Sequence, residues 1–196
     1  MVISDRRLPR IPGSHEKATT HGKALAKVAV ALLEKAVSTH MAGLSFAQTA
    51  IDLKTKLDMA RIPEAKRIVE LHEQGRDLEI APTQKQANYM RSEARRILSL
   101  VDQQLYYRST VVSAISFCGL ALVGLPGEPF NEVGMQVRGN SKFPVTCLLC
   151  NANGSFGYFP TSEAYEQGGY EPYATPYEKG VAEHLADSAD QLVASL

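Results

Sequence analysis

A long apolar run that stops at a tight turn constrains the fold of this 196-residue chain most strongly. The run covers residues 111–123 and ends at the Pro-Gly pair of Gly124–Phe130, a turn that carries Glu128. A second apolar run, residues 143–150, ends in a Gly-rich loop that carries Tyr158. Continuous apolar runs of this length are typical of buried strands. We therefore expect two strand ends that converge on one point.

The rest of the chain alternates irregularly between helical and strand patterns. Apolar and polar residues alternate over 44–53, which predicts a half-exposed strand. Gly119 allows the run 110–123 to be either a hairpin or a single bent strand. We predict a mixed α/β fold, with a mixed sheet flanked by helices, because an amphipathic strand is not typical of a strictly parallel sheet. Residues 168–176 read as a loop. The expected helices cover 21–38, 63–75, 82–106, 130–139, 161–167 and 180–196. Thr161 is expected to cap the fifth of them.

Composition narrows the class of protein. The chain is 44% hydrophobic and 21% charged, which is typical of a globular domain. A formal net charge of zero gives no attraction to nucleic acid or to a membrane surface. No apolar window reaches the roughly 18 residues of a membrane span, and the start has no signal-peptide pattern. We expect a soluble chain with no transmembrane segment, while the sequence indicates no cellular compartment.

Three cysteines are present, and two of them have CxxC spacing. Cys147 and Cys150 lie in an expected strand, where positions three apart face opposite sides, so the pair is poorly placed to chelate a metal. We expect these two and Cys118 to be buried structural cysteines, with a redox or metal role as the alternative.

Glu128 and Tyr158 each allow a structural and a chemical interpretation. Glu128 either caps the helix that begins near Asn131 or presents its carboxylate to a ligand. Tyr158 either packs in its loop or takes part in chemistry, and a phenol needs a metal or strong donors to ionise near neutral pH.

Three motifs in order carry a resemblance. Gly124–Phe130 (GLPGEPF), Asn153–Thr161 (NGSFGYFPT) and Glu163–Glu171 (EAYEQGGYE) resemble the neutral/alkaline, non-lysosomal ceramidase family. The resemblance runs from about His21 to the C-terminus and is specific within 122–177. It implies that residues 21–196 form the C-terminal half of a larger α/β catalytic domain, preceded by a Pro-rich segment, residues 1–20.

The resemblance also implies a metal centre. Members of the family hold one Zn²⁺ with two His, one Glu and one Tyr, and the matching positions here are Glu128 and Tyr158. Zinc with nitrogen and oxygen ligands keeps one position open, lowers the pKa of bound water and polarises the carbonyl under attack. Ser155 stands at a substrate-binding position where members often have a second Tyr, and this departure implies the loss of a hydrogen bond to substrate or metal-bound water. The loop with Tyr170, Tyr173 and Tyr177 either forms the rim of a lipid-amide pocket or packs in the ordinary way against the C-terminal helix.

The implied function is zinc-dependent hydrolysis of the N-acyl amide bond of ceramide or a related lipid amide. The resemblance places the two His ligands and the nucleophile motif before Met1, so we expect the chain alone to bind zinc weakly and to turn over little. The alternatives are an inactive α/β domain that binds a partner or a small amide without metal, and a hydrolase of a smaller, non-lipid amide. None of the histidines stands in a ligand motif, and we expect each to be structural or exposed: His15, His21, His40, His72 and His184.

Overall fold

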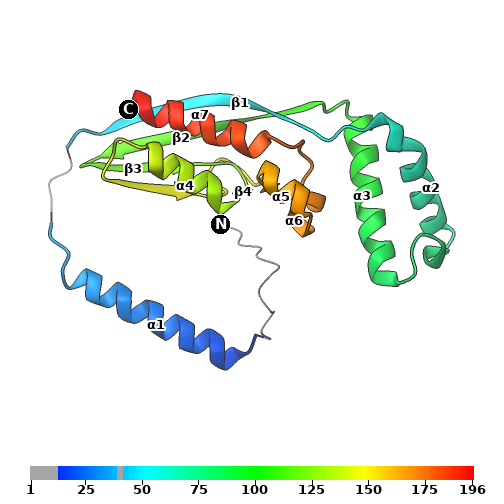
Figure 1. Cartoon of the computed structure of the whole chain (residues 1–196), viewed down its shortest axis with the longest axis horizontal. Coiled ribbons are helices and arrows are strands. Elements are labelled where there is room, and N and C mark those ends of the chain that lie inside the picture. Colours follow the sequence, from blue (N-terminus) through cyan, green and yellow to red (C-terminus); the bar gives the residue numbers. More distant parts are fainter. Residues whose placement is uncertain (1–12, 39–41) are drawn as a thin grey trace.

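The computed structural model describes residues 13–38 and 42–196 and has the predicted mixed α/β fold (Figure 1). Its main sheet has the strand order β1-β2-β3-β5. β1 pairs with β2 and β2 with β3 in antiparallel fashion, whereas β3 and β5 are parallel. The bounds of these strands are Ser45–Lys54 (β1), Tyr107–Phe117 (β2), Leu120–Gly124 (β3) and Val145–Leu149 (β5).

The apolar run 110–123 is a hairpin, as one of the two interpretations predicted. Phe117 pairs with Leu120, so Cys118 and Gly119 form a two-residue turn. Both turn residues have positive φ, 50° and 80° respectively, which is the twist that a tight hairpin requires and that glycine adopts without strain. The hairpin delivers β3 to the centre of the sheet, next to β5.

A helical hairpin is inserted between β1 and β2 and projects from one end of the sheet (Figure 1). It consists of α2 (Ile62–Glu73) and α3 (Gln84–Asp102), flanked by 3₁₀ turns at Met59–Arg61 and Asp77–Glu79. The expected helices 63–75 and 82–106 are thus confirmed with shorter bounds. The two helices bury a small core of their own, made of Ala65, Ile68, Ala94 and Ile97.

Two helices cover one face of the sheet. They are α4 (Asn131–Asn140), which connects β3 to β5, and α7 (Val181–Ser195) at the C-terminus. Buried residues of β2 and β3 such as Val112 and Val123 share a core with Leu185 of α7. This packing fixes the ends of β3 and β5, where the candidate site begins.

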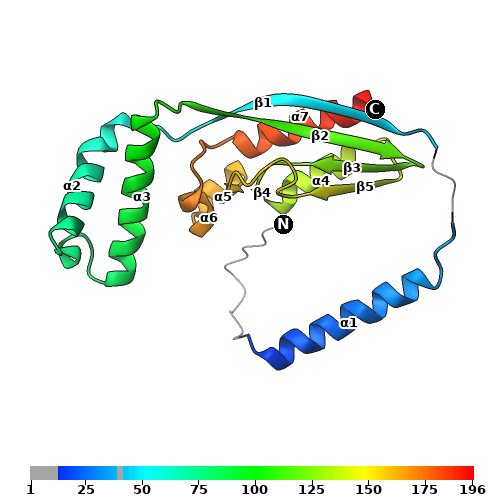
Figure 2. The same cartoon turned by 180° about the vertical axis from the view of Figure 1, so that it is seen from behind.

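The opposite face of the sheet has no helix over it within the described residues (Figure 2). Phe46 of β1 and Ile115 of β2 are register partners on this face and are 61% and 37% exposed. Val145 and Leu149 of the edge strand β5 are 53% and 45% exposed. The sheet therefore presents an apolar surface of the kind that α/β domains normally bury.

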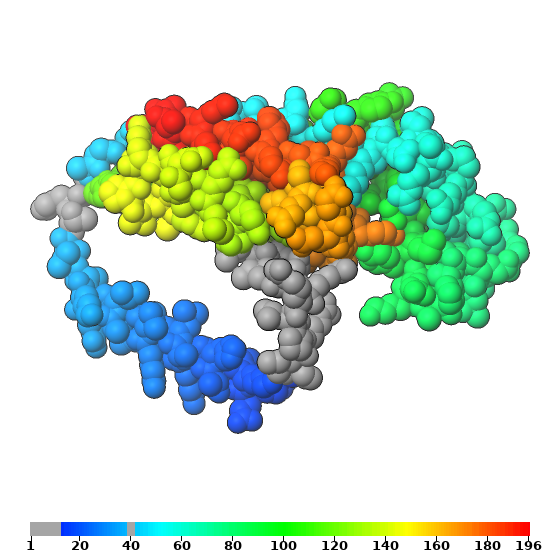
Figure 3. Space-filling view, in the orientation of Figure 1, coloured from blue at the N-terminus to red at the C-terminus, as the bar shows by residue number. Residues whose placement is uncertain are grey.

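Helix α1 (His15–Leu33) stands apart from the sheet and has no buried residue (Figure 3). It begins six residues before the expected position, because the Ser14 side chain accepts a hydrogen bond from the Lys17 amide and caps the first turn. Residues 1–12 of the predicted leading segment, and His40, lie outside the described residues.

The loops after β3 and β5 form a second, two-stranded sheet from β4 (Glu128–Pro129) and β6 (Tyr158–Phe159). The predicted helix after Thr161 is confirmed as α5 (Ser162–Gln167), and the Thr161 hydroxyl accepts from the Ala164 amide. The expected loop 168–176 was wrong in part, because it contains the short helix α6 (Tyr170–Ala174).

The prediction of buried cysteines was wrong. Cys118, Cys147 and Cys150 are all exposed. Cys118 lies in the hairpin turn, Cys147 points to the open face of the sheet, and Cys150 follows the end of β5. The apolar run 143–150 belongs to an edge strand with one uncovered face, so its apolar pattern did not imply full burial.

Candidate metal centre

Glu128 and Tyr158 are register partners in the parallel bridge between β4 and β6. Partners in adjacent strands have their side chains on the same face of the sheet, with backbones about 4.8 Å apart. The next pair, Pro129 and Phe159, is buried and faces the core. Alternation therefore turns Glu128 and Tyr158 away from the core, on a common side.

Backbone hydrogen bonds hold the two loops together. The Glu128 amide donates to the Gly157 carbonyl at 2.8 Å, and the Gly127 amide donates to the Gly154 carbonyl at 2.9 Å. Further along, the Phe130 amide donates to the Phe159 carbonyl at 3.1 Å. Such a row of backbone bonds fixes the register, so the relative position of the carboxylate and the phenol is set by the fold and not by side-chain contacts alone.

Close approach of the two loops depends on Gly127. Its φ is +63°, and a Cβ at this position would lie 2.3 Å from the Gly157 carbonyl oxygen and 2.8 Å from the ring of Phe159. Both features exclude a larger residue without movement of the backbone. The Pro-Gly turn before Glu128 is therefore a packing requirement of the site.

Asn153 anchors the second loop to the main sheet. Its Nδ2 lies 2.9 Å from the Gly124 carbonyl and 3.0 Å from the Val111 carbonyl. Its side chain also exchanges hydrogen bonds with the Ser113 hydroxyl. A side-chain amide thus replaces the missing strand partner where β3 ends, and it holds the loop that leads to Tyr158.

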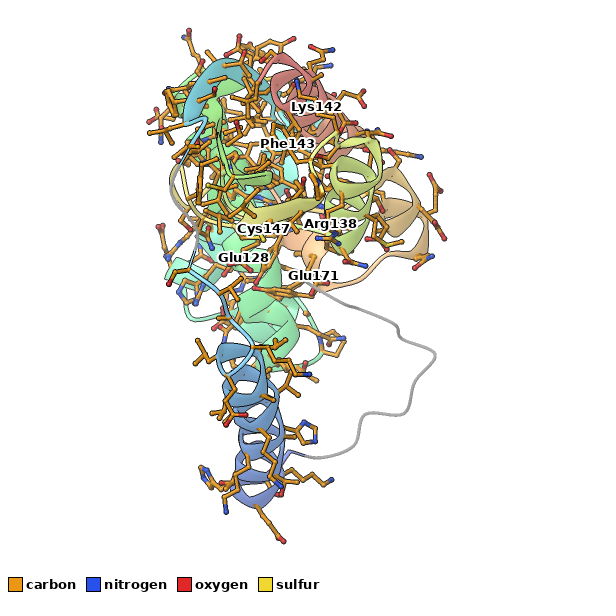
Figure 4. The ribbon with its side chains drawn as sticks, turned by 90° about the vertical axis from the view of Figure 1, so that its left-hand side faces the viewer. Glu128, Arg138, Lys142, Phe143, Cys147 and Glu171 are labelled. Atoms are coloured by element: carbon orange, nitrogen blue, oxygen red, sulfur yellow. The ribbon has the colours of Figure 1, made fainter. Side chains whose placement is uncertain are left out.

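Three groups surround the phenol of Tyr158. Its pKa is raised above the ordinary value, first by partial burial and then by the charge of Glu128, by Tyr170 and by the charge of Glu171. The Tyr158 and Tyr170 rings meet edge to face with centroids 5.8 Å apart. Figure 4 shows Glu128 and Glu171 at the same edge of the body. The carboxylates of Glu128 and Glu171 therefore lie near the phenol, and their negative charge opposes its ionisation.

Glu171 was missed by sequence reasoning. It lies in the first turn of α6, a helix that was expected to be a loop. No local signal separates it from the other acids of this region, because it comes near Tyr158 only through the placement of α6. Its position within the third family-like motif, Glu163–Glu171, is the one feature that pointed to this segment.

Helix α6 is fixed from its C-terminal end. The guanidinium of Arg96 on α3 donates to the carbonyls of Ala174 and Thr175 at 2.6 Å and 2.7 Å. Lys56 donates to the carbonyl of Pro172. The Thr175 hydroxyl then donates to the Tyr158 carbonyl at 2.7 Å, which ties α6 directly to β6. Cations at a helix C-terminus satisfy its free carbonyls.

The glutamate and the tyrosines proposed from the sequence differ in their surroundings. Phe130 is the N-cap of α4 and makes no side-chain capping bond, and the alternative that the Glu128 carboxylate favours this helix start stays a prediction. Tyr170 is 55% exposed, whereas Tyr173 stacks on Tyr89 of α3 with centroids 3.8 Å apart. Tyr177 is buried in the core and stacks on Phe159, so this residue packs as the ordinary alternative predicted. 

Ser155 is exposed in the loop between β5 and β6, two residues before the Gly157 contact. Its proposed role in substrate binding remains a prediction. The described histidines agree with a structural or surface position. His72 bonds with Asp77 at 2.8 Å, and His15, His21 and His184 are exposed.

The donor set fits part of a zinc site. Glu128, Tyr158 and the adjacent Glu171 offer oxygen ligands, which zinc accepts alongside imidazole. Within residues 13–38 and 42–196, no group of three or more His, Cys, Asp or Glu side chains is arranged to hold a metal ion. These residues therefore supply at most one side of a four-ligand site.

Comparison with known protein families, curated proteins and solved structures found no match to this chain. The assignment of the site consequently depends on its geometry and on the motif resemblance. Across the described residues, no helix is both long and apolar enough to cross a membrane.

Proposed function

We propose that this chain carries one side of the active site of a zinc-dependent amidohydrolase that cleaves the N-acyl bond of ceramide or a related lipid amide. The observation that carries the proposal is the bridge that places Glu128 and Tyr158 side by side at the end of the sheet. The ordered motifs supply the reaction class, and the geometry supports a shared point of action for these two residues.

Glu128 and Tyr158 would hold the metal. Zinc bound there would supply a Lewis acid for the amide carbonyl and activate water for attack. The chain's own contribution is to position the oxygen donors. Burial, and after it the charges of Glu128 and the neighbouring Glu171, raise the pKa of the Tyr158 phenol, and a bound dication would lower it again.

The remaining ligands would come from another polypeptide segment, which the resemblance places upstream. The open face of the sheet supports this part of the proposal, because exposed apolar residues such as Phe46 and Val145 mark a surface that another layer of an α/β domain would cover. The same segment would then bring imidazole ligands and the nucleophile motif to the edge that carries Glu128.

A second candidate function is a metal-free domain that binds a partner or a small amide. It is favoured by the scarcity of ligands within the described part of the chain, where Glu128 and Tyr158 have no histidine beside them. In that case the side-chain oxygens of Glu128 and Tyr158 would accept hydrogen bonds from the amide group of a ligand.

Measurements of zinc content and of amide hydrolysis distinguish the two functions. The protein is expressed from its native locus, so that any polypeptide encoded upstream of Met1 is kept. Glu128→Ala is expected to remove both zinc and release of the fatty acid, while the exposed Glu163→Ala keeps both. Zinc content that stays unchanged in Glu128→Ala would reject the ligand assignment.

A further inference from the structure

Two hollows lie along helix α3, beside the candidate metal centre. The nearer one has a volume of about 200 Å³ and lies between α3 and α6, with Tyr89, Arg96, Tyr170 and Tyr173 among its lining residues. The farther one has a volume of about 360 Å³ and is lined by Ile80, Pro82, Tyr89 and Met90 among others. Tyr89 lines both hollows and is the residue that they share.

Aromatic contacts connect these hollows to Tyr158. The ring of Tyr170 lies 5.8 Å from that of Tyr158 and 6.5 Å from that of Tyr89, measured between centroids. Tyr89 in turn stacks on Tyr173 at 3.8 Å. Tyrosine rings offer a wide apolar surface with little conformational freedom to lose on binding. An apolar wall therefore runs from the candidate metal centre onto α3.

The charges at the nearer hollow are compensated within the protein. Glu93 pairs with Arg61 at 2.6 Å and lies 3.7 Å from the Arg96 guanidinium. Arg96 also donates to the carbonyls at the end of α6. Because these groups already have partners, the hollow does not require a charged ligand, and its exposed lining is mostly apolar.

We propose that the two hollows form one groove that binds a linear, uncharged hydrocarbon chain, whose polar end lies at Tyr158. In the lipid amide of the proposed function, this chain would be the acyl or alkyl tail of the substrate, so that part of the inference rests on the proposed function. Binding of the chain itself depends only on the groove and requires no metal.

The test measures the affinity of the metal-free chain for dansyl-labelled dodecanamide by fluorescence, in the presence of a chelator. Ser92 lines the nearer hollow and is exposed, so Ser92→Trp would fill that hollow without removing a buried contact. It is expected to weaken binding about tenfold or more, because displacing two methylene groups costs about that factor. Arg95→Trp, exposed on α3 and outside both hollows, is the matched control and should bind like the unmodified chain.

A second variant tests continuity of the groove. Gln86 is exposed and lines the farther hollow, so Gln86→Trp is expected to weaken binding of labelled hexadecanamide while leaving labelled octanamide unaffected. Circular dichroism verifies that each variant is folded. The inference is overturned when the unmodified chain binds no labelled amide, or when Ser92→Trp and Gln86→Trp bind every chain length like Arg95→Trp.

Failure of this inference is distinguishable from failure of the proposed function. Chain binding is measured in Ser92→Trp and Gln86→Trp, which lie outside the metal centre, whereas zinc content is measured in Glu128→Ala. Loss of zinc in Glu128→Ala with no effect of Ser92→Trp on chain binding would support the metal centre and reject the groove. The reverse pair of results would support the groove and reject the metal centre.

Discussion

Glu128 and Tyr158 face the same side of a two-residue parallel bridge, and the charge of Glu128 contributes to the raised pKa of the Tyr158 phenol. Two residues thirty positions apart are thus coupled electrostatically by the ends of β3 and β5. This coupling can be measured without any metal, and it underlies the first prediction.

Glu128→Gln is expected to lower the pKa of Tyr158, because it removes a negative charge that disfavours the phenolate. The chain has no tryptophan, so the absorbance of tyrosinate can be followed on a clean background. Tyr158→Phe is made both in the unmodified chain and in Glu128→Gln. Subtracting its titration curve from that of the matching parent isolates the contribution of Tyr158. Glu163→Gln, which changes an exposed acid on α5, should leave the pKa of Tyr158 unchanged. Equal titration curves for Tyr158 in Glu128→Gln and in the unmodified chain would contradict the coupling.

Gly127→Ala is expected to destabilise the fold by about 2–4 kcal/mol, because the new Cβ would meet the Gly157 carbonyl in a backbone conformation that alanine disfavours. The measurement is the free energy of unfolding from denaturant titration. Gly139 in α4 has open space around it and no positive φ, so Gly139→Ala should be neutral or more stable by about 0.5–1 kcal/mol. Similar losses in both variants would mean that the loops are not closely packed.

Arg96→Met is expected to cost about 2–4 kcal/mol, because the carbonyls at the end of α6 lose a charged donor while they remain partly buried. Arg95→Met, at the exposed neighbouring position, should change stability by no more than about 0.5 kcal/mol. Amide hydrogen exchange would show where the effect arises. Faster exchange confined to α6 and β6 agrees with the anchoring role, whereas a uniform increase along the chain would not.

Lys56 gives the fold a dependence on pH. Burial, followed by the charge of Arg96, lowers the pKa of Lys56 to about 8 from its ordinary value of 10.5. Between these two pH values the unfolded chain holds a proton that the folded chain has released, so stability rises with pH across the window. We expect a gain of about 1–2 kcal/mol, since the half-buried amine is still screened by water.

Lys56→Met should abolish this rise, and Lys66→Met, exposed on α2, should keep it. Comparing the variants with the unmodified chain removes the opposite effect of the buried tyrosines, whose raised pKa values reduce stability at higher pH. A slope that is the same in Lys56→Met and in the unmodified chain would contradict the assigned burial of this amine.

Local patterns predicted most of the secondary structure. The Pro-Gly turn, the cap at Thr161 and the alternation of 44–53 are confirmed, because each depends on neighbours in the sequence. The exposure of Cys147 could not be predicted, since an apolar strand does not reveal which of its faces another layer covers.

The candidate site was predictable only in part. The sequence placed Glu128 and Tyr158 at two strand ends, and the structure brings them together. Glu171 and the groove on α3 depend on contacts between segments far apart in the chain, such as the bond from Arg96 to the end of α6. The pattern of apolar and polar residues in neither segment predicts that contact.

We propose that the phenol of Tyr158 and the carboxylate of Glu128 bind one zinc ion together. The most direct test is a zinc titration of the full chain, followed by tyrosinate absorbance and by proton release. We expect one weak site whose filling ionises one tyrosine, and we expect both signals to vanish in Glu128→Ala and in Tyr158→Phe but to persist in Glu163→Ala. Zinc uptake that is the same in all of these variants, or uptake without ionisation of a tyrosine, would contradict the claim.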